Sequence, residues 1–375
     1  MTQLKWEYYE KNGKRDKAMK PILNMDLMKV KHNTSQIVRL AGQYGISVAG
    51  ITKGCCGNEE FAKAQIEAGV DFLADSRIEN LMKLEHLNIK KMLLRSPKLS
   101  ETNEVVKYAD YSLNSEIKVI RALGNSAARM NEVHSIILMI DVGDLREGIW
   151  CEDINDIFHT VESILNIEGV QLEGIGTNLT CFGGIMPTEK NYGMLVTLAE
   201  ELRRRYNLLL PIVSGGNSSS LQMIYEGRLP KGITHLRINQ SVFLGFEIGH
   251  GKKLSGWESN IVTLEAEIIE IHKKPSYPRG NRAKMNAFGN IQSFKDKGIR
   301  TRVILAIGRQ DMDMNGLHPI DPNISVEGAS SDHLIIDITD SKHHYRVGQM
   351  IKFDVVTYSS IITAMASSFI QQKIV

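Results

Sequence analysis

Short apolar runs that end on a polar residue recur eight times between residues 48 and 237. They end at Lys53, Asp75, Arg95, Asn114, Asp141, Asn178, Asn217 and Arg237. Between them, apolar residues recur at helical spacing over residues 59–68, 76–84, 116–122, 154–165, 192–206 and 219–225. Eight alternations of strand and helix predict a (β/α)8 barrel, also called a TIM barrel. A doubly wound open sheet is the alternative, but its crevice needs polar residues at only a few strand ends, whereas here every strand has one.

The segments before and after this pattern read differently. A short strand over residues 21–28 and a helix over 31–44 are predicted to precede the barrel. After Gly245, residues 261–272, 302–307, 334–338 and 350–357 alternate or run apolar between turn-rich pieces. We therefore expect an N-terminal extension (1–20), a barrel (21–247) and a C-terminal all-β domain (248–375), to which the N-terminal strand is a candidate contributor.

The composition of the chain limits the classes of binding partner to expect. The chain has 375 residues, is 42% hydrophobic and 23% charged, and carries a net charge of +2, which gives no reason to expect a nucleic acid or an acidic membrane as partner. No run approaches the ~18 apolar residues of a membrane span, and the polar first 20 residues lack the apolar core of an export signal. The four cysteines show neither a CxxC pair nor metal-ligand spacing. We expect reduced thiols, a cytoplasmic protein and no metal.

Lys53 is the first candidate for chemistry. It ends the apolar run VAGIT and is followed by GCCG, so its amine is expected at the mouth of a dry barrel. Desolvation lowers the pKa of an amine and makes it nucleophilic, as a Schiff-base lysine requires. An ordinary surface lysine in a loop has the same appearance in the sequence.

Two further candidates follow the last strands. The stretch SGGNSSSL, residues 214–221, has the small residues and hydroxyls that cradle a phosphate at a helix N-terminus, although a serine-capped turn would look alike. Arg237 lies inside an apolar strand, where a charge needs an anion or a hydrogen-bond acceptor, and a structural salt bridge would satisfy it equally.

Other polar groups are weaker candidates. Arg146 follows the fifth strand in IDVGDLREG, where its guanidinium could hold a substrate carboxylate through two hydrogen bonds, although a solvated loop arginine is commoner. Asp311, Asp332 and His333 lie in polar clusters beside strands of the second domain, and such clusters usually mark exposed turns.

Taken together, these features resemble the fold type III pyridoxal-phosphate enzymes, of which alanine racemase is the best known. The resemblance extends from about residue 22 to the end of the chain. It is carried by VAGITKGCCG, LADSRIENL, MIDVGDLREG, EGIGTNLTCFGG, VSGGNSSSL, LRINQSVFLG and GASSDHLIID. These sequence motifs are most similar to those of amino-acid racemases of the ornithine racemase type.

The resemblance implies roles for these residues with pyridoxal phosphate as cofactor. Lys53 would bind the cofactor as a Schiff base and exchange the Cα proton on one face, and Arg237 would face the pyridine nitrogen. Because a guanidinium keeps its proton, the ring nitrogen would stay unprotonated, which favours racemisation over transamination. The phosphate would be held by Ser218, Ser219 and the backbone of Asn239 and Gln240, with Asn217 beside it. Arg146 would contact the cofactor's phenolic oxygen or the substrate carboxylate.

The sequence departs from alanine racemases at three positions. Gly57 and Asn178 stand where those enzymes have a tyrosine and a histidine, so the contacts to phosphate and ring must differ. Arg309 stands where they carry the tyrosine that the partner subunit donates as second base, and arginine is a poor base. Asp311, His333 and Cys181, in that order, are the candidates for the base on the opposite face.

The resemblance also implies a homodimer with active sites shared between subunits, and a small amino acid as substrate. A basic amino acid such as ornithine would need a carboxylate for its side chain, for which Asp75, Asp311 and Asp332 are candidates, whereas alanine would need none. The alternatives are an alanine or broad-specificity racemase, a lyase similar to D-threonine aldolase, which would use a metal ion, and a non-catalytic pyridoxal-phosphate homeostasis protein. The last kind resembles a barrel alone, and the roughly 130 residues after Gly245 favour an enzyme.

Overall fold

The computed structural model describes residues 20–249, 251–291 and 293–375, and these divide into two compact units. The barrel unit contains residues 25–261 with the last two residues of the chain, and the C-terminal unit contains the described residues up to 24 together with 262–373. The predicted N-terminal extension, residues 1–20, lies outside the described residues except for Lys20.

The barrel unit is built on eight parallel strands. They are β2 (Ser47–Ile51), β3 (Phe72–Asp75), β4 (Lys90–Leu93), β5 (Tyr111–Asn114), β6 (His134–Asp141), β8 (Val170–Gly176), β9 (Ile212–Ser214) and β10 (His235–Ile238). Each strand pairs with its neighbours in this order, and the pairing of β10 with β2 closes the ring. The short β7 (Ile149–Trp150) is an additional partner of β6. The predicted TIM barrel is therefore confirmed, and the open sheet is wrong.

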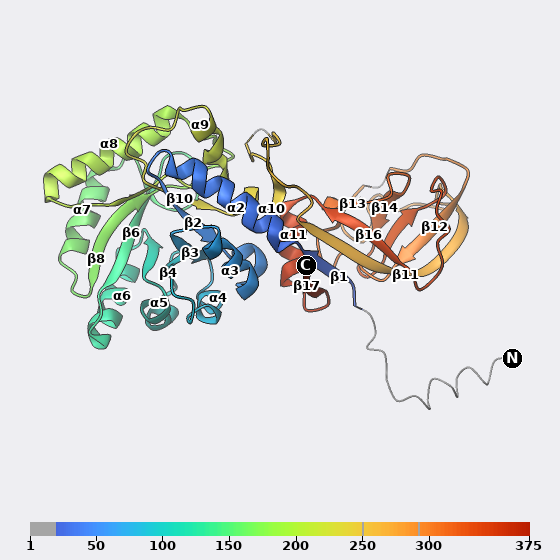
Figure 1. Ribbon diagram of the computed structural model, residues 1–375, viewed down its shortest axis with the longest axis horizontal. Helices are drawn as coiled ribbons and strands as arrows, with labels where there is room; N and C mark the ends of the chain where they lie inside the picture. The colour runs from blue at the N-terminus through green and yellow to red at the C-terminus, as the bar shows by residue number, and fades with distance from the viewer. Residues whose placement is uncertain (1–19, 250, 292) are drawn as a thin grey trace. The chain divides into compact units, whose positions relative to one another are not determined.

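Helices connect the strands and lie outside them (Figure 1). They are α2 (Leu27–Gly42), α3 (Glu59–Glu67), α4 (Ile78–Lys83), α5 (Thr102–Tyr108), α6 (Ile117–Met130), α7 (Ile154–Leu165), α8 (Glu189–Tyr206), α9 (Leu221–Tyr225) and α10 (Gln240–Leu244), with short 3₁₀ turns η1 (Lys53–Cys55), η2 (Leu99–Glu101) and η3 (Ser218–Ser220). The sequence pattern predicted α2, α3, α4, α6, α7, α8 and α9, and missed α5 and α10.

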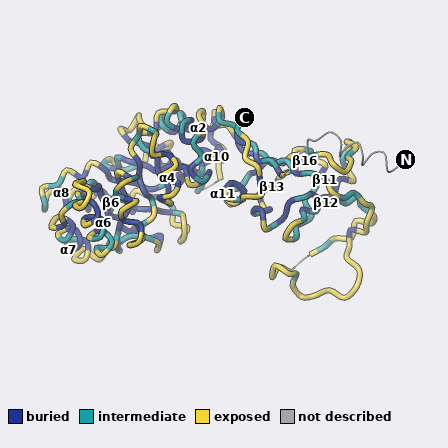
Figure 2. Tube along the Cα trace, turned by 90° about the horizontal axis from the view of Figure 1, so that it is seen from below, coloured by how far each residue is buried: buried dark blue, intermediate teal, exposed yellow. Residues whose placement is uncertain are grey.

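The centre of the barrel is an apolar core. Side chains from several strands fill it, among them Ile51, Met92, Leu113, Ile137 and Met139, each at most 5% exposed. In Figure 2 the strands of this unit are accordingly almost continuous buried backbone. Since the interior is packed, polar side chains at the carboxyl ends of the strands are confined to the mouth, where barrels carry their sites.

The C-terminal unit is mainly antiparallel sheet. Its strands are β11 (Val262–Pro275), β12 (Ile299–Leu305), β13 (Leu317–Pro319), β14 (Ser325–Ala329), β15 (Leu334–Asp337), β16 (Met350–Val355) and β17 (Gln371–Ile374), with one 3₁₀ turn, η4 (Met314–Gly316), and one helix, α11 (Tyr358–Ala366). The sheet order is β13-β16-β11-β12-β15-β14, and β1 (Ile22–Met25) joins it by pairing with β11 and β17. The predicted C-terminal β domain is therefore confirmed, with α11 as its unpredicted helix.

Three further properties concern the described residues alone. None of their helices is long and apolar enough to cross a membrane. They contain no group of three or more His, Cys, Asp or Glu side chains placed to hold a metal ion. All four cysteines are free thiols.

Candidate active site

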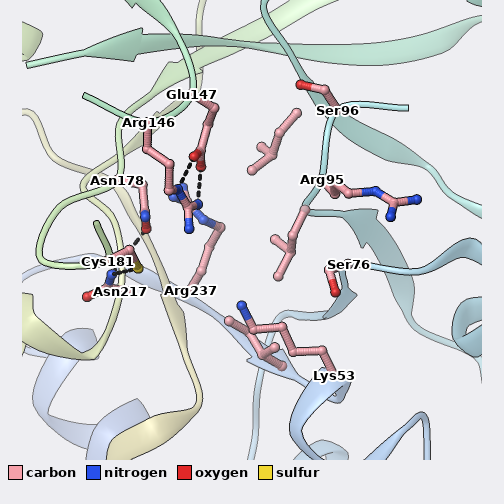
Figure 3. A pocket seen from close by; sticks show the side chains of 13 residues that line it. Lys53, Ser76, Arg95, Ser96, Arg146, Glu147, Asn178, Cys181, Asn217 and Arg237 are labelled. Atoms are coloured by element: carbon pink, nitrogen blue, oxygen red, sulfur yellow. Dashed lines mark hydrogen bonds and ion pairs between the residues drawn. The ribbon is translucent and has the colours of Figure 1, made fainter. Parts of the chain in front are cut away.

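A cavity of about 330 Å³ opens among the strand ends of the barrel unit (Figure 3). Its polar lining comes from the loops after six different strands, which is the arrangement that barrel active sites share. It is lined by Ile51, Lys53, Ser76, Leu94, Arg95, Ser96, Leu113, Arg146, Glu147, Asn178, Cys181, Asn217 and Arg237. Lys53, Arg146, Asn178, Asn217 and Arg237, all predicted from the sequence, thus line one cavity together.

Lys53 presents its amine to the middle of this cavity. It lies two residues beyond β2, at the start of η1, and Figure 3 shows its side chain reaching inward from that turn. Burial lowers the pKa of the amine, and the nearby cations Arg146 and Arg237 act in the same direction, while the charges of Cys181 and Asp75 oppose it. Lowering the pKa raises the fraction of neutral amine, which is the nucleophilic form.

Asp75 does not line the cavity. Its side chain is fully buried, and burial raises its pKa. One carboxylate oxygen accepts from Thr52 Oγ1 at 2.7 Å, and the other accepts from the backbone N–H of Arg77 at 2.9 Å and from Asn80 Nδ2 at 3.1 Å. With both oxygens hydrogen-bonded inside the protein, Asp75 has the contacts of a residue that fixes the turn carrying Lys53.

Arg237 is buried at 4% exposure and is held by neutral acceptors. Its Nη2 donates to Thr177 O at 2.7 Å, and its Nη1 donates to Ser214 Oγ. Burial lowers the pKa of the guanidinium to about 10, so it remains a cation at neutral pH. The Ser214 hydroxyl also contacts His235 Nδ1 at 2.8 Å, and burial lowers the pKa of this histidine to about 3. Ser214 Oγ thus accepts from Arg237 and also shares a hydrogen bond with His235, which is neutral at pH 7.

Arg146 and Glu147 form an ion pair at the cavity wall. Glu147 accepts from both Nε and Nη2 of Arg146, and Figure 3 shows its carboxylate turned toward Arg146 and Arg237. The hydrogen bonds to Glu147 raise the pKa of Arg146 against the opposing effect of burial. The side chains are 40% and 23% exposed, so the pair remains in reach of a ligand.

Asn178, Asn217 and Cys181 form the adjoining wall. Asn217 Nδ2 donates to Asn178 Oδ1 at 3.1 Å and Leu179 O at 2.8 Å, and contacts Cys181 Sγ at 3.4 Å. The Nδ2 of Asn178 is buried and has no hydrogen-bond partner in the protein. An unpaired buried donor at a cavity wall calls for an acceptor on a ligand.

Hydroxyls and backbone N–H groups gather beside the cavity, after β9 and β10. Ser218 Oγ contacts the N–H groups of Asn239 at 3.4 Å and Ser241 at 3.3 Å, both long contacts, and the buried Ser241 Oγ has no partner in the protein. Ser219 donates to Asn217 Oδ1 through both its N–H and its hydroxyl, and Gln240 begins α10 beside them. Unsatisfied donors in small residues fit the oxygens of a phosphate group.

The remaining predicted residues belong to the C-terminal unit, and none lines the barrel cavity. Asp311 is buried and accepts from the N–H of Gly308 at 2.8 Å. Asp332 and His333 are exposed and pair with each other at 2.9 Å.

Two features of the site were missed at the sequence level. Glu147 directly follows the predicted Arg146, and a carboxylate beside a candidate arginine was the available signal. Asp144 is fully buried and ties two loops together: its carboxylate accepts from the N–H groups of Cys181 at 3.1 Å, Phe182 at 2.9 Å and Ile185 at 3.3 Å. The loop that carries Arg146 thereby fixes the loop that carries Cys181.

Comparison with known proteins identifies related sequences and similar folds. The family model "Alanine racemase, N-terminal domain" matches residues 25–238. Ornithine racemase of Acetoanaerobium sticklandii is 44% identical over 95% of this chain and 100% of its own, and lysine racemase of Thermotoga maritima is 38% identical over 94% and 98%. The fold is also similar to alanine racemase from Bartonella henselae with covalently bound pyridoxal phosphate, with a TM-score of 0.71 and 16% identity over 95% of this chain and 100% of that one.

Proposed function

Because the chain belongs to the alanine racemase family and is an amino-acid racemase, we propose that it interconverts the L and D forms of ornithine or another basic amino acid with pyridoxal phosphate as cofactor. The observation that carries the proposal is the amine of Lys53, whose pKa is lowered by desolvation and which shares one cavity with Arg146 and Arg237. The two relatives named for ornithine and lysine support the basic substrate.

The residues present fit the cofactor. When bound, pyridoxal phosphate would accept the negative charge left on Cα after the α-proton is removed. Lys53 would bind its carbonyl carbon covalently, and the unpaired donors of Asn178 and Ser241 would meet the acceptors of its ring and phosphate. Arg237 would hold the ring nitrogen, and because it stays a cation it would donate a hydrogen bond there without transferring its proton.

The chain's own groups then move the α-proton. Lys53 would be the base on the face from which it reaches the cavity. Arg146 would hold the substrate α-carboxylate through its guanidinium, as a bidentate donor. Racemisation also requires a proton carrier on the opposite face.

We propose Cys181 as the first candidate for that carrier, ahead of Asp311 and His333. Cys181 lines the same cavity as Lys53, and its Sγ contacts Nδ2 of Asn217 at 3.4 Å in the same wall as Asn178. Asp311 and His333 lie in the C-terminal unit and do not line this cavity. We retain the homodimer with shared active sites, and the cytoplasmic location, as part of the proposal.

The test is chiral chromatography of ornithine, lysine and alanine incubated with the purified protein and pyridoxal phosphate. Conversion of L-ornithine or L-lysine to the D form faster than that of alanine is the expected result. Faster conversion of alanine would refute the basic substrate, cleavage products would indicate a lyase, and no turnover would leave a cofactor-binding protein.

The role of Lys53 has its own control. Lys53→Ala should abolish both turnover and the mass increase of one cofactor after borohydride reduction. Lys63→Ala, which removes an exposed lysine of α3, should keep both. A Lys53→Ala protein that still gains the reduced cofactor would overturn the assignment.

A further inference from the structure

The cavity holds a single carboxylate among several cations. Of its described lining residues, Lys53, Arg95, Arg146 and Arg237 are basic, whereas Glu147 alone is acidic. The cations suit a phosphate and an α-carboxylate, but neither of these anions gives a reason for an acidic side chain in the same wall. Glu147 therefore answers a different requirement.

The other carboxylates close to this cavity are already saturated inside the protein. One oxygen of Asp75 accepts from Thr52 beside Lys53 and the other from Arg77 and Asn80. Both oxygens of Asp144 accept backbone N–H groups of the neighbouring loop. Removing either from its donors would leave buried groups unpaired, at substantial cost. Glu147 bonds only a side chain that is 40% exposed, so its partner can be exchanged.

The pairing of Glu147 with Arg146 matches the charges of a diamino acid. An exposed Arg–Glu pair contributes little net free energy, so opening it costs little. A basic amino acid brings both an α-carboxylate for Arg146 and a distal ammonium for Glu147, and each charge finds a new partner in the same wall. Alanine brings the carboxylate alone and would leave Glu147 facing the cavity without the hydrogen-bond partner that it has in Arg146.

We propose that Glu147 is the specificity-determining residue of this racemase: it receives the distal ammonium of the substrate while Arg146 turns to the α-carboxylate. The proposal rests on the racemase function proposed above for the same cavity. It replaces Asp75 as the acidic partner of the substrate side chain and needs neither Asp311 nor Asp332.

The test compares two substrates of equal chain length in the holoenzyme, ornithine and its uncharged analogue norvaline. Glu147→Gln keeps the shape of the side chain and removes its charge. We expect kcat/KM for ornithine to fall about ten- to hundred-fold, mostly through KM, because one charge-assisted hydrogen bond is lost. For norvaline it should stay level or rise. Glu147→Asp should recover part of the ornithine activity, and Glu152→Gln, at an exposed glutamate nearby, should change neither substrate.

A binding readout separates specificity from a damaged site. Titrating the bound cofactor's absorbance with D-ornithine and D-norvaline should show weaker binding of ornithine alone in Glu147→Gln. If Glu147→Gln lowers both substrates equally, Glu147 merely orients Arg146 and the proposal is wrong. If the wild-type protein racemises norvaline as well as ornithine, the proposal fails while the racemase stands, whereas turnover of neither substrate refutes the function itself.

Discussion

Removing the hydroxyl of Ser214 should destabilise the protein because that hydroxyl serves two buried groups at once. It accepts from Nη1 of Arg237 and contacts Nδ1 of His235 at 2.8 Å. Ser214 and His235 are fully buried and Arg237 is 4% exposed, so water cannot replace a missing partner. Ser214→Ala keeps the strand and deletes only the shared atom.

The size of the effect follows from what is left unpaired. The substitution orphans a guanidinium N–H and an imidazole nitrogen, each of which costs about 1–3 kcal/mol when buried, and more for the charged group. Because Arg237 keeps its bond to Thr177 O, we expect a total loss of about 3–5 kcal/mol. That is a large part of the stability of an ordinary protein.

Urea unfolding of the barrel unit, followed by circular dichroism at pH 7.5, measures the loss. Ser112→Ala is the matched control, because Ser112 is also buried and bonds a histidine, His134, at 2.7 Å, but has no arginine partner. We expect the control to lose clearly less. If Ser214→Ala costs under about 1 kcal/mol, or no more than Ser112→Ala, then Arg237 does not depend on Ser214. In the holoenzyme, Ser214→Ala should also shift the absorbance of the bound cofactor, since Arg237 loses its orientation.

Three shorter predictions concern other groups. Burial lowers the pKa of His134 to about 4 from an ordinary 6.5. The stability that its neutral form contributes is therefore fully present above about pH 6.5 and is lost as the pH falls toward 4. When the pH is lowered from 7.5 to 5, His134→Gln should lose about 2 kcal/mol less free energy of unfolding than the wild type, measured by urea unfolding. Asp144→Asn keeps one acceptor oxygen and puts an amide donor against a backbone N–H, which should cost about 1–3 kcal/mol in the same assay and lower kcat, and an unchanged midpoint would contradict its role as a clamp. In deuterium oxide, Cys181→Ala should stop racemisation but keep α-hydrogen exchange from one enantiomer. The same pattern in Asp311→Asn or His333→Asn instead would assign the opposite face to that residue of the C-terminal unit.

The barrel was predictable because its strands are short, buried on both sides and ended by polar residues. What the pattern missed has physical reasons. Helix α5 buries little beyond Thr102 and Val105, so seven mostly polar residues show no helical stripe. Helix α11 is rich in apolar and β-branched residues and follows a strand, so its sequence resembles a continuation of that strand. Every residue of β14 is half-buried, which removes the alternation that marks a strand.

The candidate site was predictable where a side chain follows directly from a strand end, as for Lys53 and Arg237. It was not predictable where a loop conformation decides the direction of the side chain. Leu145 has a left-handed backbone with φ +56°, and Gly148 has φ +122° and lies so close to β6 that a Cβ there would meet Asp141 N at 2.6 Å. These two positions set the path between them and thus bring Glu147 to the cavity, and no hydrophobic pattern encodes that path.

Asp144 ties the loop that carries Glu147 to the loop that carries Cys181 in the adjoining wall of the cavity. This link bears on how substrate specificity can change. A buried carboxylate is costly unless hydrogen bonds satisfy it, and here three backbone N–H groups of the loop around Cys181 do so. The Arg146–Glu147 pair and the thiol are therefore presented by two loops that are fixed together, while Lys53 and Arg237 are fixed by strands β2 and β10. The groups that would meet the substrate side chain thus differ in their support from those that would hold the cofactor. Substitution in the two loops can alter which amino acid is accepted without disturbing the barrel that supports the chemistry.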